Sequence, residues 1–368
     1  MKKITLFLMI SILLPILLVS CKKTEYKPVE STEEELQTVM TLTFDDKTYE
    51  VKYELYRALF LSQKSSIDGG DSSVWSGENK EEYIKLADAL VAEEASEIYG
   101  AFYVCEKIGV DVYSDSFEKA IKKMITLSVD GGYDEISGQE LVGFEGDYDK
   151  YLESLKKMNI NYSVQTLMIR YSLALEEIYK HYTGTLEGDT VTQGAITYTD
   201  EEIKSFYFGQ ECVNVMRAFF PIENYKSARV KELRDKMSQM AEEGTEAFLN
   251  YTYGILPIGS DLGDGEIIAK SNLDPEYYSE LTEIAFSLPV SSVSEPIEVI
   301  TGYTDGYHIL YKLEKSEQFF TNNKTHITSV YLENEIAKIL NNAARGLTDG
   351  AKNESVLDSI DRASISME

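Results

Sequence analysis

The side chains able to carry out chemistry in this chain are few and widely spaced. Its three histidines, His181, His308 and His326, lie far apart in the sequence and do not have the spacing of zinc ligands. Several clusters are rich in Asp and Gly, but none has the ligand spacing of an EF-hand loop. The sequence contains neither a Walker phosphate-binding loop nor a G-x-S-x-G motif. We therefore expect no metal and no cofactor.

The first of the three cysteines is expected to carry lipid. Two lysines precede an apolar run over residues 4–19, and the run ends in Leu18, Val19, Ser20 and Cys21. This ending resembles a bacterial lipobox, which implies cleavage before Cys21 and a diacylglyceryl group on its sulfur. The alternative, a membrane-spanning helix, is disfavoured because the run is shorter than the ~20 residues needed. We expect a signal peptide at 1–20 and a lipid-anchored protein on the extracytoplasmic side of a bacterial membrane.

The other two cysteines give little evidence of redox chemistry. Cys105 and Cys212 are far apart in sequence and form no C-x-x-C pair. Cys105 lies in the apolar run Ile-Tyr-Gly-Ala-Phe-Tyr-Val-Cys, which is typical of a buried small hydrophobic residue. We expect no disulfide framework.

The chain carries a formal net charge of -28. A surface this acidic repels nucleic acid, so a DNA or RNA partner is not expected. Two interpretations stay open: the charge keeps the protein soluble, or it also favours cationic client chains.

Hydrophobic periodicity indicates which elements position these residues. Residues 21–38 are polar and Glu-rich, which indicates a flexible tether. Residues 39–51 alternate around Asp45-Asp46-Lys47 and predict a hairpin. Residues 81–108 carry apolar side chains at steps of three and four, so we expect a long helix with one buried stripe. The first half of the chain therefore predicts a mostly helical domain over residues 39–195.

The second half contains strands as well as helices. Thr199-Asp200-Glu201-Glu202 is a capping box that opens a helix. A strand is expected over 213–221, a helix over 227–243, and a helix, a turn and two strands over 281–310. Residues 327–344 form an amphipathic helix whose apolar face needs a partner. The polar end, residues 346–368, predicts a flexible tail.

Several motifs carry a resemblance to known families. The segments Ala-Phe-Ser-Leu, Val-Ser-Glu-Pro-Ile and Gly-Tyr-His-Ile-Leu, with Ile-Gly-Ser-Asp-Leu-Gly before them, resemble parvulin-type (PpiC-like) peptidyl-prolyl isomerases. Earlier segments, among them Glu-Lys-Ile-Gly-Val-Asp-Val, resemble extracytoplasmic foldases of the PrsA and SurA type. The resemblance implies an α+β protein. Its helical chaperone domain, 39–195, is completed by a C-terminal helix within 317–345, and its parvulin-like domain, 196–316, has a four-stranded antiparallel sheet and flanking helices.

The resemblance also implies a set of site residues. Parvulins use two strand histidines, and these positions are His308 and, by substitution, Arg217. The position of the family's Cys or Asp falls on Tyr253. The positions implied to contact a bound client are Tyr253, Leu262, Tyr277, Leu281 and Phe286. One of the two histidines is thus kept, and the acidic or thiol group is absent.

The roles of the two strand residues remain open at this stage. His308 is either catalytic or a scaffold residue that holds its neighbours by hydrogen bonds. Arg217 stays protonated, so it cannot accept a hydrogen bond. It either donates to a client carbonyl or pairs with an acid such as Asp261, and we favour the pair.

The sequence therefore predicts a membrane-anchored foldase or chaperone that binds unfolded or partly folded exported polypeptides. Its parvulin-like domain is expected to have weak or no isomerase activity. The alternative is an active peptidyl-prolyl cis-trans isomerase with substituted catalytic groups. A solute-binding lipoprotein is disfavoured, because it needs two similar α/β lobes and the first half has almost no strand pattern.

Overall fold

The computed structural model describes residues 26–68, 71–134, 139–187, 190–257, 265–271, 279–299 and 305–366. These residues form two compact units. One unit, which we call the sheet unit, is Ile196–Lys338, and the other, the helical unit, combines the chain before Ile196 with Ile339–Glu368. The predicted signal peptide, Cys21, Leu262 and Tyr277 lie outside the described residues.

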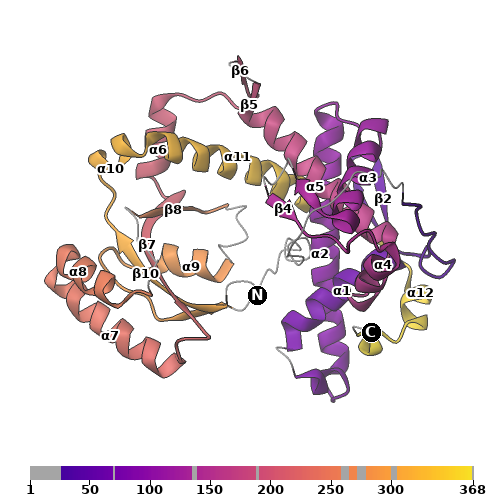
Figure 1. The fold of residues 1–368 in the computed structure, drawn as a ribbon, viewed down its shortest axis with the longest axis horizontal. Helices are drawn as coiled ribbons and strands as arrows, with labels where there is room; N and C mark the ends of the chain where they lie inside the picture. The colour runs from indigo at the N-terminus through magenta and orange to yellow at the C-terminus, as the bar shows by residue number, and fades with distance from the viewer. Residues whose placement is uncertain are drawn as a thin grey trace. The chain divides into compact units, whose positions relative to one another are not determined.

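The helical unit is built from five main helices (Figure 1), which are α1 (Tyr53–Asp68), α2 (Lys80–Lys107), α3 (Asp115–Asp130), α4 (Tyr148–Lys157) and α5 (Tyr162–Thr183). The predicted stripe of α2 is buried, from Ile84 through Val91 to Ala101. Apolar residues at this spacing share one face, so their burial holds α2 at the centre of the unit. Two short hairpins, β3–β4 (Gly132–Asp134, Gln139–Leu141) and β5–β6 (Gly184–Glu187, Thr190–Gln193), follow α3 and α5.

The predicted hairpin at the start of the unit is the middle and edge of a three-stranded sheet. Strands β1 (Thr38–Phe44) and β2 (Lys47–Lys52) are antiparallel, and Asp45 in the turn has a φ of 52°. Asp tolerates this left-handed conformation better than most residues, which explains its place there. The third strand, β11 (Thr348–Lys352), pairs with the other edge of β1.

The C-terminal segment expected to be a flexible tail is therefore folded into the helical unit, which corrects that prediction. After β11, the segment continues as α12 (Glu354–Ser359) and a turn of 3-10 helix, η3 (Arg362–Ser364). Leu357 and Ile365 are buried, at 1% and 6% exposure. The backbone of β11 is paired with β1, the donors of α12 are satisfied within its own turn, and Leu357 and Ile365 are buried, so the segment has a reason to stay ordered.

The sheet unit contains the four-stranded antiparallel sheet that the sequence predicts. Its order is β8 (Glu266–Ala269), β7 (Cys212–Pro221), β10 (Gly306–Leu313), β9 (Ile297–Val299). The helices of this unit are α6 (Asp200–Phe208), α7 (Ser227–Glu243), α8 (Thr245–Ile255), α9 (Ser279–Ser287), α10 (Glu317–Asn322) and most of α11 (Lys324–Gly346). The α+β class expected from the sequence is confirmed.

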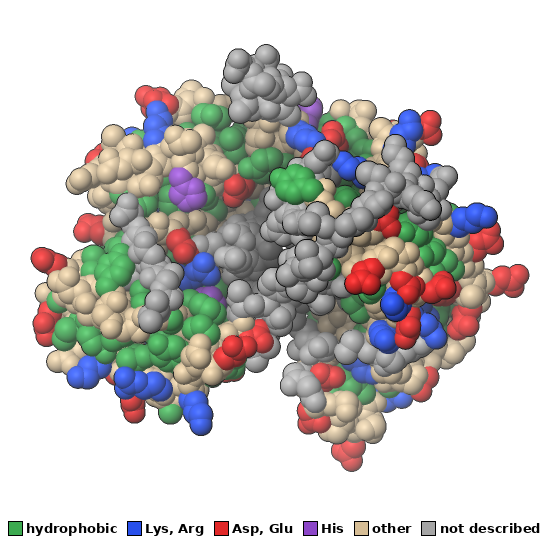
Figure 2. Space-filling model, viewed as in Figure 1, with side chains coloured by type: hydrophobic (Ala, Val, Ile, Leu, Met, Phe, Trp, Pro, Cys, Tyr) green, Lys and Arg blue, Asp and Glu red, His purple; other side chains and the backbone are tan. Residues whose placement is uncertain are grey.

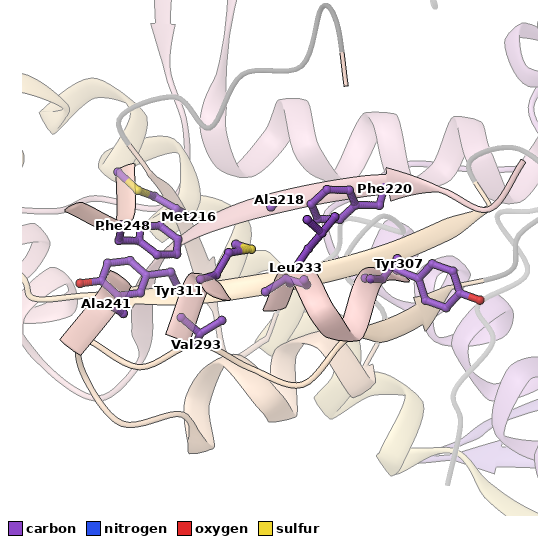
Figure 3. Packing of buried hydrophobic residues seen from close by; sticks show 12 residues of the cluster. Met216, Ala218, Phe220, Leu233, Ala241, Phe248, Val293, Tyr307 and Tyr311 are labelled. Atoms are coloured by element: carbon purple, nitrogen blue, oxygen red, sulfur yellow. The ribbon is translucent and has the colours of Figure 1, made fainter. Parts of the chain in front are cut away.

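Helices cover both faces of this sheet. On one face, α7 and α8 pack against side chains of β7 and β10, and Phe248 stacks on Tyr311 with ring centroids 4.1 Å apart (Figure 3). On the other face, α9 packs through Leu281 and Ala285 (Figure 1). Successive residues of a strand point to opposite faces, so each strand contributes to both cores. The two strand residues of interest, Arg217 and His308, lie on the α9 side.

Helix α11 continues from the sheet unit into the helical unit. Its first part joins Ile327 and Val330 to a cluster with α6 and the ends of β7 and β8. Its last turns pack against α2, where a Cβ placed on Gly100 would lie 3.0 Å from the backbone nitrogen of Ala344. The helical unit is thus discontinuous in the sequence. Among the described residues, no helix has the length and apolar character of a membrane span.

Candidate functional site

The candidate site lies where β7 and β10 pair on the α9 face of the sheet. His308 stands directly opposite Phe219, and Arg217 stands opposite Leu310. Cross-strand partners in an antiparallel pair point to the same face, as do residues two apart in one strand. Arg217, Phe219 and His308 therefore share one face, as the parvulin resemblance implies for the two strand positions.

His308 is enclosed by the protein. Its side chain is 4% exposed, and its ring lies against Phe219 with centroids 4.9 Å apart. Burial and, secondarily, the positive charge of Arg217 lower the pKa of His308 from 6.5 to about 4. The imidazole is therefore neutral at physiological pH. Its Nδ1 is buried without a hydrogen-bond partner among the described residues.

Arg217 is held by an acid on the neighbouring strand. Its Nε donates to Oε1 of Glu266 over 3.3 Å, and the two side chains are 20% and 32% exposed. The register of β7 and β8 pairs Glu266 with Val215, which places the carboxylate diagonally across from Arg217. The sequence favoured an ion pair for Arg217, and the structure shows one, with Glu266 as the acid. The suggested partner, Asp261, lies outside the described residues.

The described members of the predicted client-contact set lie in different environments. Leu281 is fully buried in the core between the sheet and α9, so it offers no surface to a client here. Phe286 is partly buried against the same core. Tyr253 is 48% exposed on α8, the helix that packs on the opposite face through Phe248. The role of these residues in client contact stays a prediction.

Sequence reasoning missed two members of the site, Phe219 and Glu266. A signal for Phe219 was present, since it follows Arg217 by two residues in a predicted strand and must share its face. Glu266 had no such signal, because its position depends on the register between β7 and β8, which are far apart in sequence.

The arrangement limits the chemistry available at this site. A neutral buried imidazole beside a paired guanidinium offers hydrogen-bond donors, but the described residues place no thiol next to them. Cys105 and Cys212 are free and buried, and burial raises the pKa of Cys105 to about 12 and of Cys212 to about 11. No group of three His, Cys, Asp or Glu among the described residues is arranged to hold a metal.

Comparison with known proteins gives alignments with solved structures alone. No family model and no curated sequence matches the chain. The crystal structure of PrsA from Bacillus subtilis aligns with 84% of this chain and 91% of its own, at 16% identity and a TM-score of 0.24. The foldase protein PrsA of Streptococcus pneumoniae aligns with 78% of this chain and 93% of its own, at 14% identity and a TM-score of 0.26.

A SurA-like chaperone of Campylobacter jejuni also aligns, with 70% of this chain and 91% of its own, at 16% identity and a TM-score of 0.18. These are the kinds of protein that the sequence motifs resemble. The TM-scores are low, so the term parvulin-like refers here to the sequence motifs of the sheet unit, one of which contains His308.

Proposed function

We propose that this chain is an extracytoplasmic foldase that acts mainly as a chaperone, with a parvulin-like unit of weak or absent isomerase activity. The observation that carries the second part is the pairing of Arg217 with Glu266 beside a buried His308. Where parvulins have a second histidine, this chain has a guanidinium that is already engaged.

The free-energy barrier of isomerisation explains why the pairing of Arg217 reduces catalysis. Rotation about a peptide bond has a barrier of ~18–20 kcal/mol, because the twisted amide loses its resonance. A catalyst must bind the twisted amide more tightly than either planar form. Arg217 would have to break its contact with Glu266 before donating fully to a client carbonyl, and that cost reduces its preference for the transition state.

Client binding is supported by the surface and by the charge. Large hydrophobic side chains are exposed on both units, including Leu86 and Tyr113 on the helical unit and Phe208 and Val290 on the sheet unit. Asp and Glu side chains are spread over the visible surface of each unit (Figure 2), in keeping with the net charge of -28. Such a surface attracts basic, unfolded chains, and binding them keeps their apolar segments from associating.

The membrane anchor is a further part of the proposal. The lipobox-like ending at Cys21 supports a diacylglyceryl group, and two acyl chains suffice for stable attachment. The described part of the predicted flexible tether, residues 26–37, lies against the helical unit, where Ser31 Oγ donates to Glu54 and the Tyr148 hydroxyl donates to the carbonyl of Lys27, which corrects that prediction. The anchor would then hold the folded units beside the membrane, where exported polypeptides emerge unfolded.

Two assays on the same preparation test the proposal. Suppression of aggregation of a chemically unfolded basic protein measures chaperoning, and a protease-coupled assay on an X-Pro peptide measures isomerisation. We expect suppression at near-stoichiometric amounts and little acceleration of isomerisation. The active isomerase, favoured by the retained His308, predicts the reverse pattern.

A further inference from the structure

The folded C-terminal segment, residues 354–366, lies on a set of buried polar side chains of the helical unit. We call this the tail groove and define it by the residues that hold the segment, which are Tyr56, Lys64, Asp88 and Asn159. They come from α1, α2 and the turn after α4. The segment enters the groove directly after β11, the strand that pairs with β1.

The groove binds the main chain of the segment. Lys64 Nζ donates to the carbonyl oxygens of Ala363, at 2.5 Å, and Ile365, at 2.6 Å. Asn159 Nδ2 donates to the carbonyl of Ser366 at 2.5 Å. Lys64 and Asn159 are each only 9% exposed. These carbonyl oxygens belong to the 3-10 turn η3 and the residues after it, and any polypeptide that adopts such a turn presents carbonyl oxygens there, so these contacts do not depend on the sequence that occupies the groove.

One contact in the groove does select a side chain. Arg362 Nη1 donates to Asp88 Oδ2 over 2.7 Å, and Asp88 Oδ1 accepts from the Tyr56 hydroxyl over 2.5 Å. The side chains of Arg362 and Asp88 are 16% and 9% exposed. Three residues later, Ile365 is 6% exposed. The groove therefore accepts a basic side chain followed three positions on by an apolar one.

The contacts of residues 362–366 are mainly polar, apart from the buried Ile365, and in this they differ from those of a purely structural strap, which the buried Leu357 of α12 resembles. Burying a cation or a carboxylate carries a large desolvation cost, and apolar contacts of the same size often hold a segment as well or better. Groups that bind carbonyls and a cation are instead suited to an occupant that exchanges, because a second chain can make the same contacts.

We propose that the tail groove is a client-binding site that the C-terminal segment fills in cis. A client segment that adopts a similar turn, with an Arg or Lys and an apolar residue three positions later, displaces it, because a 3-10 turn of about three residues brings these two positions to one side. This deepens the proposed function, on which it rests, by naming the class of client. The acidic balance of the chain favours the same basic segments.

The covalent connection of the C-terminal segment to the rest of the chain explains how such a site is regulated. A segment attached by a short connection has an effective concentration on the order of mM. A free client peptide is bound in proportion to the fraction of molecules whose groove is open, so the tail weakens apparent binding by that factor. Ser359 and Ile360 of the segment line a cavity of about 600 Å³ together with Glu33 and Glu34, among other residues, so acidic side chains lie next to the segment.

The experiment uses the full mature chain and a variant whose tail is loosened by Arg362→Ala and Ile365→Ala. The probe is a fluorescein-labelled peptide with the sequence of residues 359–366, SIDRASIS. A second probe is an unrelated Gly/Ser peptide that keeps only an Arg and, three residues later, an Ile. Fluorescence anisotropy gives the dissociation constants, and in each probe the arginine is also replaced by glutamine.

We expect the loosened variant to bind both probes at least about tenfold more tightly than the full chain, and the glutamine peptides to lose about tenfold. Asp88→Asn in the loosened background should give the same loss, whereas Glu93→Gln, an exposed acid on the same helix, should not. Replacing arginine in the peptide tests the contact even where Asp88→Asn fails to fold.

Equal binding by the full and loosened chains, or binding of the tail peptide but not of the unrelated one, would overturn the proposal and leave the segment as a strap. Aggregation suppression by the unaltered chain is measured in parallel. Its absence would remove the proposed chaperone function, while the peptide titrations report on the groove independently.

Discussion

At the scale of single residues, two buried ionisable side chains give the units opposite responses to pH. In the sheet unit, the pKa of His308 is lowered to about 4 by burial and by Arg217. In the helical unit, burial raises the pKa of Glu94 to about 8. Glu94 accepts from Gln63 Nε2 at 2.8 Å, and its protonated form has a hydroxyl donor beside Gln63 Oε1, which has no partner among the described residues.

For His308, the unfolded chain binds a proton more readily than the folded one. Stability is unaffected above pH 6.5 and falls as the pH drops from 6.5 toward 4, by up to about 1 kcal/mol per pH unit. Urea unfolding at pH 5 and pH 7 measures this effect. The control His308→Phe places an uncharged ring beside Phe219 and should lose the dependence; an unchanged slope would contradict the assignment.

For Glu94, the sign is reversed because the folded state holds the proton. Stability is greatest below pH 4.5 and falls as the pH rises from 4.5 through 8, again by up to about 1 kcal/mol per pH unit. Glu94→Gln keeps the hydrogen bond with Gln63 and removes the titration. Unfolding followed by Trp75 fluorescence at pH 6 and pH 8 reports on the helical unit, and a wild-type slope equal to that of Glu94→Gln would show that Glu94 is ionised when folded.

At the scale of elements, two glycines in helices allow the effect of an added Cβ to be compared at a closely packed position and at an open one. A Cβ on Gly100 of α2 would lie 3.0 Å from the Ala344 backbone nitrogen, whereas a Cβ on Gly254 of α8 would meet nothing within 4 Å. Alanine favours a helix by ~1 kcal/mol over glycine. We expect Gly254→Ala to stabilise by up to ~1 kcal/mol and Gly100→Ala to destabilise by ~1–2 kcal/mol through overpacking.

Thermal unfolding of the two variants measures this difference. The same direction of change in both would mean that α2 and α11 do not depend on close packing at Gly100. The measurement therefore tests how the C-terminal part of α11 belongs to the helical unit.

Elements were predictable from the sequence where the pattern was local. The expected helix at 81–108 is α2 (Lys80–Lys107), and the expected strand at 213–221 is β7 (Cys212–Pro221). The strand β11 was not predicted, because Thr-Asp-Gly-Ala-Lys has no strand alternation and its partner β1 is distant in the sequence. Its pairing depends on where the preceding helix delivers the chain, which periodicity does not report.

The candidate site, too, was predictable from the sequence only where local motifs determine it. His308 and Arg217 were placed by motif, and the sheet brings them to one face. The acid that holds Arg217, Glu266, follows from a register between separate strands and was not accessible to pattern reading.

At the scale of the whole molecule, the membrane anchor is a prediction from the sequence alone. Cys21 lies outside the described residues, and the claim depends on the lipobox-like run before it. Expression in bacteria grown with labelled palmitate should give a labelled protein, and Cys21→Ala should abolish the label. Cys105→Ala is the control and should keep it, since that thiol is buried in the helical unit. Label retained by Cys21→Ala would contradict the anchor.

The central claim, that the parvulin-like unit has kept its frame without an efficient isomerase site, is tested most directly by one rate. In a protease-coupled assay on an X-Pro peptide, the uncatalysed step takes tens of seconds or longer. We predict that the chain changes this rate by less than about twofold at catalytic amounts, and that His308→Ala makes no difference. A large acceleration that His308→Ala abolishes, and that the tail-loosening substitutions in the helical unit leave unchanged, would contradict the account.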